Sequence, residues 1–187
     1  MVKKRACIFI SGSGTNLRSI IKNSRDYNFP INVSLVISNK KGAKGICFAK
    51  KFSIPHIILD FEKDKFEKIA IKELLDRKIN LVCLAGFMTV LSKRFVRNFK
   101  GKIINIHPSL LPKYKGLNTF KRILNAGEQI TGCTVHFVDE KLDNGKIIVK
   151  KRVSISKKES PEQLKKKVQS EEYKAYSIAI RRIYNPN

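Results

Sequence analysis

The 187-residue chain has few acidic residues, no paired cysteines and no long apolar run, and each shortage excludes a class of protein. None of its apolar stretches approaches the ~20 residues that a membrane-spanning helix requires. The four cysteines stand singly, without the Cys-x-x-Cys spacing of metal or redox sites. We therefore expect a cytoplasmic protein with reduced, buried cysteines and no metal site.

The shortage of acidic residues leaves a strongly basic chain, with 39 Lys and Arg against 15 Asp and Glu and a net charge of +24. Such a charge favours nucleic acid as a partner. However, the lysines are spread along the chain, and we find neither aromatic stripes for base stacking nor a helix-turn-helix pattern. We do not expect nucleic acid binding, although a non-catalytic binding module stays an alternative. The charge would help to collect phosphorylated and polycarboxylate substrates.

Strand-like and helix-like patterns alternate along the chain, as a doubly wound α/β sheet requires. The predicted strands are residues 5–10, 32–37, 56–59, 81–85, 102–106, 131–138 and 146–153. The predicted helices are residues 16–23, 43–51, 65–77, 93–98 and 120–125 and a last one that begins after Ser160. This order predicts one Rossmann-like domain over residues 1–187. We expect a mostly parallel sheet with helices on both faces, followed by an antiparallel strand pair and a C-terminal helix.

The last predicted helix has a clear start signal. Ser160 is suited to the N-cap, Pro161 to the first helical position and Gln163 to the third position of a capping box. Four apolar side chains then recur at helical spacing and are expected to face the core: Leu164, Val168, Ala175 and Ala179.

A predicted buried strand ends in the string Asn-Ile-His-Pro-Ser-Leu-Leu-Pro at residues 105–112. Asn105 and His107 are two residues apart and therefore share one face of that strand. An amide and a protonated imidazole that point at one place can stabilise a developing oxyanion. A carboxylate such as Asp143 would keep the imidazole charged by raising its pKa. The pattern implies no serine or cysteine nucleophile.

The turn Ser-Gly-Ser-Gly-Thr-Asn at residues 11–16 follows the first predicted strand and begins the first predicted helix. Glycines allow several backbone N–H groups to point at one anion, and the helix N-terminus adds a favourable dipole. The turn does not complete the dinucleotide fingerprint, because position 17 is leucine. A phosphate site and a simple tight turn are both compatible with the sequence.

These motifs, with Leu-Asp-x-Gly around Asp143, resemble the folate-dependent formyltransferases along nearly the whole chain. The resemblance implies the formyltransferase fold and transfer of a formyl group from 10-formyltetrahydrofolate to the amine of glycinamide ribonucleotide in purine synthesis. By the same resemblance, Asn105, His107 and Asp143 are catalytic and no metal is used. Without it, Asp143 would be interpreted as a solvated turn residue.

The resemblance also implies two sets of binding residues. The substrate set is Gly14, Thr15, Asn16 and Glu172, and the donor set is Lys63, Met88, Thr89, Val90 and Leu91 together with Asn105. Residues 88–91 could instead pack in the core, and Glu172 could lie on a solvated helix face. Thr134 and His136 alternate with apolar residues and are expected to share a strand face opposite the core, where His136 would support the site.

This chain also departs from the family at four positions. Thr89 replaces a basic residue and Lys63 an arginine, whereas Asn118 and Phe120 stand where many relatives have histidines.

Two other members of the superfamily are alternatives. A methionyl-tRNA formyltransferase would suit the basic charge, but it has a C-terminal RNA-binding domain and a different first loop. A formyltetrahydrofolate deformylase usually has an extra N-terminal domain. The sequence gives no prediction of oligomeric state.

Overall fold

The structure is a computed structural model that describes residues 2–60 and 62–185. It contains two compact units, residues 1–104 and residues 105–187. The strands are hydrogen-bonded in the order β3-β2-β1-β4-β5-β6-β7, and β5 (Lys102–His107) runs across the boundary between the units. Each unit is described by itself below.

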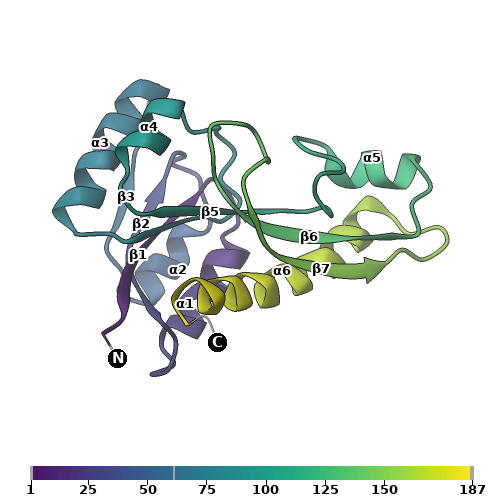
Figure 1. Ribbon diagram of the computed structural model, residues 1–187, viewed down its shortest axis with the longest axis horizontal. Coiled ribbons are helices and arrows are strands. Elements are labelled where there is room, and N and C mark those ends of the chain that lie inside the picture. The colour runs from purple at the N-terminus through teal and green to yellow at the C-terminus, as the bar shows by residue number, and fades with distance from the viewer. Residues whose placement is uncertain (1, 61, 186–187) are drawn as a thin grey trace. The chain divides into compact units, whose positions relative to one another are not determined.

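The first unit holds the parallel part of the sheet, in which β1 pairs with β2 and β4, and β2 pairs with β3. Figure 1 shows α1 and α2 on one side of these strands and α3 and α4 on the other. The elements, in chain order, are β1 (Lys4–Ile10), α1 (Thr15–Ser24), β2 (Ile31–Ser38), α2 (Ile46–Lys51), β3 (His56–Ile58), α3 (Lys63–Asp76), β4 (Leu81–Leu84) and α4 (Lys93–Asn98).

The core of the first unit contains a cluster of phenylalanine rings. Phe9 of β1 makes edge contacts with Phe66, Phe87 and Phe95, and Phe66 stacks on Phe87 with ring centroids 5.5 Å apart. Aromatic pairs at such distances add to the free energy gained by burying the rings. Phe87 thereby anchors the segment that follows β4 to the centre of the unit.

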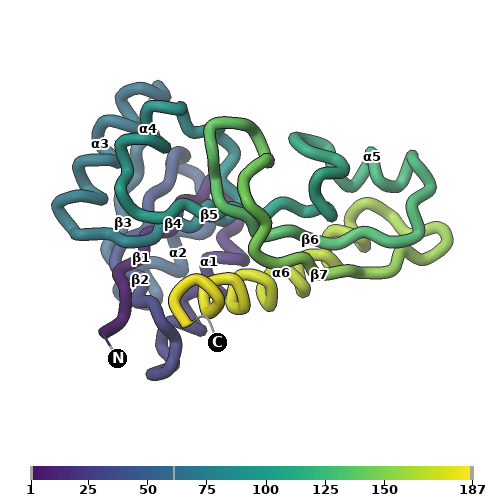
Figure 2. The backbone as a smooth tube through the Cα atoms, viewed as in Figure 1, coloured from purple at the N-terminus to yellow at the C-terminus, as the bar shows by residue number. Residues whose placement is uncertain are grey.

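The second unit contains the antiparallel pair β6 (Ile130–Phe137) and β7 (Ile147–Ser154), with α5 (Thr119–Asn125) and α6 (Pro161–Tyr184). Helix α6 packs against both strands, and all four residues that were predicted to face the core are buried. Two long connections leave this framework, residues 108–118 before α5 and residues 138–146 between β6 and β7 (Figure 2).

The predicted elements are all confirmed, with shifts of a few residues at their ends. Two burial expectations are wrong. Cys47 is exposed because it lies on the outer side of the short helix α2, whereas the other three cysteines are buried. Thr134 and His136 are also buried, because β6 is covered on both faces rather than on one. In the described part of the chain, no helix is both long and apolar enough to cross a membrane.

The capping box of α6 allows a stability prediction. The Ser160 hydroxyl accepts from the Gln163 backbone N–H, and the Gln163 side chain accepts from the Ser160 N–H. We expect Ser160→Ala to lower the free energy of unfolding by about 0.5–2 kcal/mol, measured by urea denaturation, because the Gln163 backbone N–H loses its partner. Ser170→Ala, an exposed change in the same helix, is the control. Equal effects of the two substitutions would contradict a capping role.

Candidate active site

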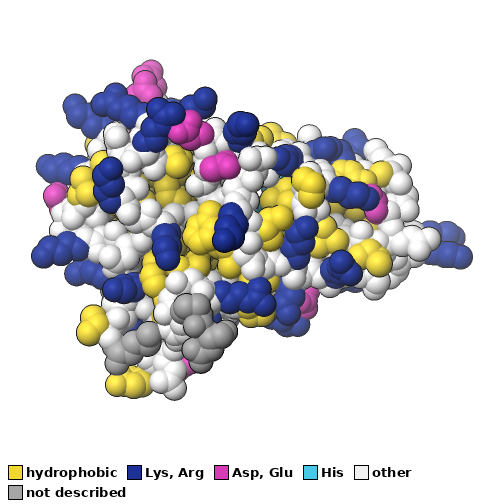
Figure 3. All heavy atoms as spheres, viewed as in Figure 1, with side chains coloured by type: hydrophobic (Ala, Val, Ile, Leu, Met, Phe, Trp, Pro, Cys, Tyr) yellow, Lys and Arg dark blue, Asp and Glu magenta, His cyan; other side chains and the backbone are white. Residues whose placement is uncertain are grey.

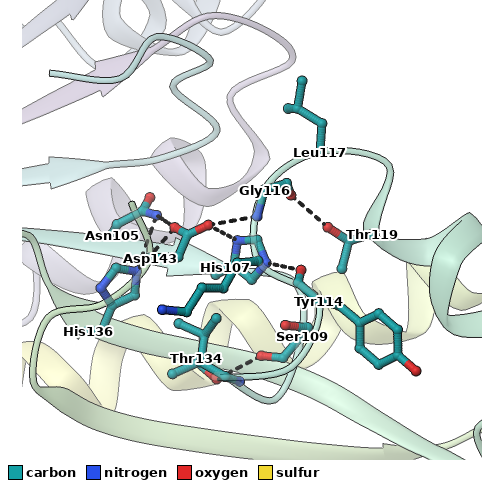
Figure 4. A network of polar contacts seen from close by, with 12 residues as sticks. Asn105, His107, Ser109, Tyr114, Gly116, Leu117, Thr119, Thr134, His136 and Asp143 are labelled. Carbon is teal, nitrogen blue, oxygen red and sulfur yellow. Dashed lines mark hydrogen bonds and ion pairs between the residues drawn. The ribbon is translucent and has the colours of Figure 1, made fainter. Parts of the chain in front are cut away.

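Strand β5 delivers two of the predicted catalytic side chains to one place. Asn105 is half-buried and His107 is 5% exposed. The neighbouring Ile104 and Ile106 point to the opposite face of the strand. Asp143, from the connection between β6 and β7, approaches both (Figure 4). Three residues that are up to 38 positions apart in the sequence therefore form one polar cluster in the second unit.

Both ring nitrogens of His107 face an acceptor. Nδ1 lies 3.2 Å from Asp143 Oδ2, and Nε2 lies 2.8 Å from the backbone carbonyl oxygen of Tyr114. A neutral imidazole has one N–H and can satisfy one of these acceptors, whereas the imidazolium satisfies both. The surroundings of the ring are therefore built for the protonated form.

The pKa of His107 nevertheless lies below its ordinary value. Burial lowers it, and the Tyr114 carbonyl and Asp143 act in the opposite direction without overcoming burial. The prediction that Asp143 would give a raised pKa is therefore wrong in its outcome, although the carboxylate acts in the predicted direction.

Asp143 is held in place by several donors. Its Oδ2 accepts from the Gly116 N–H at 3.0 Å, and its Oδ1 lies 3.7 Å from His136 Nε2. Burial raises the pKa of Asp143, but the bonds from His136 and Gly116 and the adjacent His107 outweigh it and hold the pKa below its ordinary value. The residue is 8% exposed, so the interpretation as a solvated turn residue is wrong.

Asn105 makes only long contacts in this cluster. Its Nδ2 lies 3.5 Å from Asp143 Oδ1 and 3.4 Å from His136 Nε2, at the outer limit for hydrogen bonds. Such contacts cost little to exchange for a shorter bond to a negatively charged oxygen. The amide is therefore available as a donor to a reacting group.

The sequence reasoning missed the backbone groups of residues 114–116. The Tyr114 carbonyl binds His107 and the Gly116 N–H binds Asp143. The segment is fixed by Arg122 of α5, which donates to the Lys115 carbonyl at 2.6 Å and lies over the Tyr114 ring. The available signal was the Gly116 position after the Pro-Lys-Tyr-Lys run, which suggests a special turn but not its partners.

A second buried network orders the start of the same connection. The Thr134 hydroxyl donates to the Ser109 carbonyl at 2.7 Å and accepts from the Leu111 N–H at 3.0 Å. The Ser109 hydroxyl in turn donates to the Lys113 carbonyl at 2.6 Å. Thr134 therefore links β6 to the loop that carries the Tyr114 carbonyl.

Other second-unit residues have more distant roles. Glu172 on α6 is 9% exposed, so the interpretation as a solvated helix face is wrong. Asn118 precedes α5 as its N-cap residue with φ of 55°, and Phe120 lies in the first turn of α5. Neither side chain titrates, so neither replaces a histidine in moving protons.

The three buried cysteines of this chain are poor nucleophiles. Burial raises the pKa of the Cys7 and Cys83 thiols well above the ordinary value. Burial, with the negative charge of Glu172, raises the pKa of Cys133 to about 12. The thiolate is the reactive form, so these side chains stay inert.

Among residues 2–60 and 62–185, no cluster of His, Cys, Asp and Glu is arranged to hold a metal ion.

The predicted phosphate turn lies in the first unit at the N-terminus of α1. Gly14 precedes the helix with φ of 72°, and a Cβ there would collide with Cα of Gly45. The first turn of α1 has no acidic residue, and Thr15 and Asn16 lie in it, half-buried and buried respectively. The helix dipole and the N–H groups of a helix's first turn favour an anion at such a position.

The predicted donor segment also belongs to the first unit, after β4. Met88 and Val90 are 62% and 57% exposed, whereas Leu91 is buried. Core packing therefore accounts for Leu91 and fails for the other two. Lys63 is exposed at the first position of α3. The structure brings together Asn105, His107 and Asp143 in the second unit, and it places residues 14–16, 63 and 88–91 in the first.

Comparison with known proteins gives consistent matches. Residues 4–180 match the family model described as formyl transferase. The phosphoribosylglycinamide formyltransferase of Haemophilus influenzae is 40% identical over 182 residues, which cover 95% of this chain and 86% of that protein. The solved phosphoribosylglycinamide formyltransferase of Bacillus halodurans is 36% identical with a TM-score of 0.92, and the match covers 98% of this chain and 96% of that one.

Some relatives are much longer. The trifunctional purine biosynthetic protein adenosine-3 of Drosophila melanogaster is 41% identical over 189 residues. This match covers 98% of the present chain and 14% of the fly protein. The chain likewise spans 18% of the chicken protein of the same name.

Proposed function

The chain belongs to the formyl transferase family, and from this membership we propose that it transfers a formyl group from 10-formyltetrahydrofolate to the amine of glycinamide ribonucleotide. The observation that carries the proposal is the cluster of Asn105, His107 and Asp143 around the end of β5. An amide, a buried imidazole and a carboxylate within hydrogen-bonding reach supply the groups that formyl transfer to an amine needs.

The donor supplies a formyl carbonyl whose oxygen gains negative charge as the acceptor amine adds to it. Asn105 Nδ2 donates to that oxygen, exchanging its long contacts for a short one. We propose His107 as the carrier that takes a proton from the attacking amine and returns it to the departing nitrogen. Asp143 and the Tyr114 carbonyl stabilise the imidazolium between these two transfers.

The first unit supports binding of both substrates. The exposed apolar side chains of Met88 and Val90 suit the flat ring of the folate donor, which loses contact with water when it binds. The positive charge of Lys63 suits the acidic tail of the same donor. The turn at Gly14, Thr15 and Asn16 suits the phosphate and ribose of the acceptor. In the second unit, we propose that the buried carboxylate of Glu172 also contacts glycinamide ribonucleotide.

We expect release of tetrahydrofolate from the donor to require glycinamide ribonucleotide. The measurement is the absorbance change of 10-formyltetrahydrofolate with and without the acceptor, since proximity of the two substrates drives the reaction. Equal release in water alone would indicate a deformylase, and transfer to charged initiator tRNA would indicate the tRNA enzyme. Either result would overturn the proposal.

The basic charge is the argument for a nucleic-acid-binding module. On the face in Figure 3, Lys and Arg side chains are scattered among other residues rather than gathered in one patch. Scattered charge supports the attraction of small anionic substrates more than a nucleic-acid footprint. A salt-sensitive mobility shift with DNA or RNA at low protein concentration would favour the alternative.

A further inference from the structure

A chain of hydrogen bonds in the first unit connects the segment after β4 to the ends of β1 and β2. The Ser11 hydroxyl donates to Asn39 Oδ1 at 2.6 Å, and Asn39 Nδ2 donates to Thr89 Oγ1 at 2.8 Å. The Met88 N–H donates to the Ser11 hydroxyl oxygen at 2.9 Å, and the Ser11 N–H donates to the Gly86 carbonyl at 3.2 Å. The segment is thus held at positions 86, 88 and 89.

Sheet topology explains why these residues meet. Strands β2, β1 and β4 are neighbours and parallel, so their carboxyl ends lie at one edge. Ile10, the last residue of β1, pairs with Ser38, the last residue of β2, so Ser11 and Asn39 are the first residues after two adjacent strands. Ser11 is also the first residue of the phosphate turn at residues 11–16.

The direction of each bond gives Asn39 a specific task. Its Oδ1 takes the hydroxyl hydrogen of Ser11 and so leaves the serine oxygen as the acceptor for the Met88 N–H. Its Nδ2 donates to the hydroxyl oxygen of Thr89. Thr89 therefore uses its polar group to fix the segment in place.

We propose that Asn39 and Thr89 are positioning residues that couple the phosphate turn to the donor segment, so that each substrate tightens the binding of the other. The inference rests on the proposed function. An anion in the turn further orders Ser11, which already bonds Gly86 and Met88 in the free protein, and so further orders the donor segment. Because this ordering is shared by the two ligands, the second ligand has less conformational entropy to lose. The coupling is reciprocal by thermodynamic necessity.

The test measures binding of tetrahydrofolate, which has no formyl group to transfer, by calorimetry with and without saturating glycinamide ribonucleotide. We expect glycinamide ribonucleotide to lower the Kd of the wild-type protein for tetrahydrofolate by about 5-fold or more. Thr89→Val removes the hydroxyl that anchors Asn39, at nearly constant shape, and should bring this ratio closer to one. Thr89→Ser restores the hydroxyl and should restore the ratio, which a merely structural role of the side chain would not require.

A second readout follows the segment directly. Hydrogen exchange of the peptide containing Met88 should slow when glycinamide ribonucleotide alone is added to the wild-type or Thr89→Ser protein. It should slow less in Thr89→Val or Asn39→Ala, which keep the direct bonds of Ser11 to residues 86 and 88. A wild-type Kd ratio of one, or an unchanged ratio in Thr89→Val, would overturn the coupling. Turnover that depends on glycinamide ribonucleotide would persist in that case, so failure of this inference is distinguishable from failure of the proposed function.

Discussion

Asn105→Ala should lower kcat by about 10²–10³-fold while leaving the fold intact. Loss of one preorganised donor to a developing oxyanion typically has an effect of this size. The amide is only loosely engaged in the free protein, with contacts of 3.4 and 3.5 Å to His136 and Asp143. Its strong bond is therefore expected in the transition state, and its removal should change kcat more than KM.

The measurement is steady-state kinetics of both substrates, with urea denaturation to check stability. Asn98→Ala provides a matched control, because Asn98 is exposed at the end of α4 in the other unit. A variant at position 105 with nearly normal kcat and a raised KM would show that the amide binds the ground state instead. That result would not contradict the proposed formyl transfer, but it would contradict the proposal that Asn105 stabilises the developing oxyanion.

The fold could be predicted well because its signals are local. The start of α6 is encoded in Ser160, Pro161 and Gln163, and the structure contains the complete capping box. The buried strands of a parallel sheet show as continuous apolar runs, such as the wholly buried residues 6–10 of β1. Such patterns depend on neighbours in the sequence and need no knowledge of tertiary contacts.

Burial on two faces was harder to predict. The alternation around Thr134 and His136 suggested one face away from the core, yet both side chains are buried. Glu67 on α3 is also buried, because its carboxylate accepts from the backbone N–H and hydroxyl of Ser92. Partners 25 residues away in the sequence compensate the cost of burying Glu67 and Thr134, and no local pattern predicts these partners.

The site was predicted in its side chains but not in its backbone. Asn105 and His107 share a strand face by simple alternation, and Asp143 was assigned through the family resemblance. The carbonyl of Tyr114 depends on a residue with φ of 58°, which the sequence does not announce. The low pKa of His107 depends on burial that appears only in three dimensions. The sequence therefore predicts which side chains form the cluster, but it does not predict how their surroundings shift their pKa values.

Asp143 can be tested with a substitution that the backbone accepts. The residue has φ of 46°, in the left-handed region that Asn adopts more readily than most residues. Asp143→Asn therefore removes the negative charge while keeping the shape of the loop. Asp139→Asn is the control, because Asp139 is exposed in the same loop and bonds Lys141 and Asn144 rather than the imidazole.

We expect Asp143→Asn to lower kcat/KM at neutral pH by about 10²-fold or more, since a positioned acid–base group contributes about 10²–10⁴-fold. A nearby negative charge favours the protonated ring, so its removal should lower the pKa of His107 further below its ordinary value. The ring then becomes a weaker base. The limb of the kcat/KM profile that rises as His107 loses its proton should therefore move to lower pH without restoring the wild-type maximum.

Direct NMR titration of the imidazole separates the electrostatic role of Asp143 from a structural one. The chain has three histidines, so a His107→Gln variant identifies the His107 signal by its loss. The signal should titrate at lower pH in Asp143→Asn than in the wild type and at the wild-type position in Asp139→Asn. A slow Asp143→Asn enzyme with an unmoved His107 pKa would leave Asp143 only the task of ordering residues 114–116 through the Gly116 N–H.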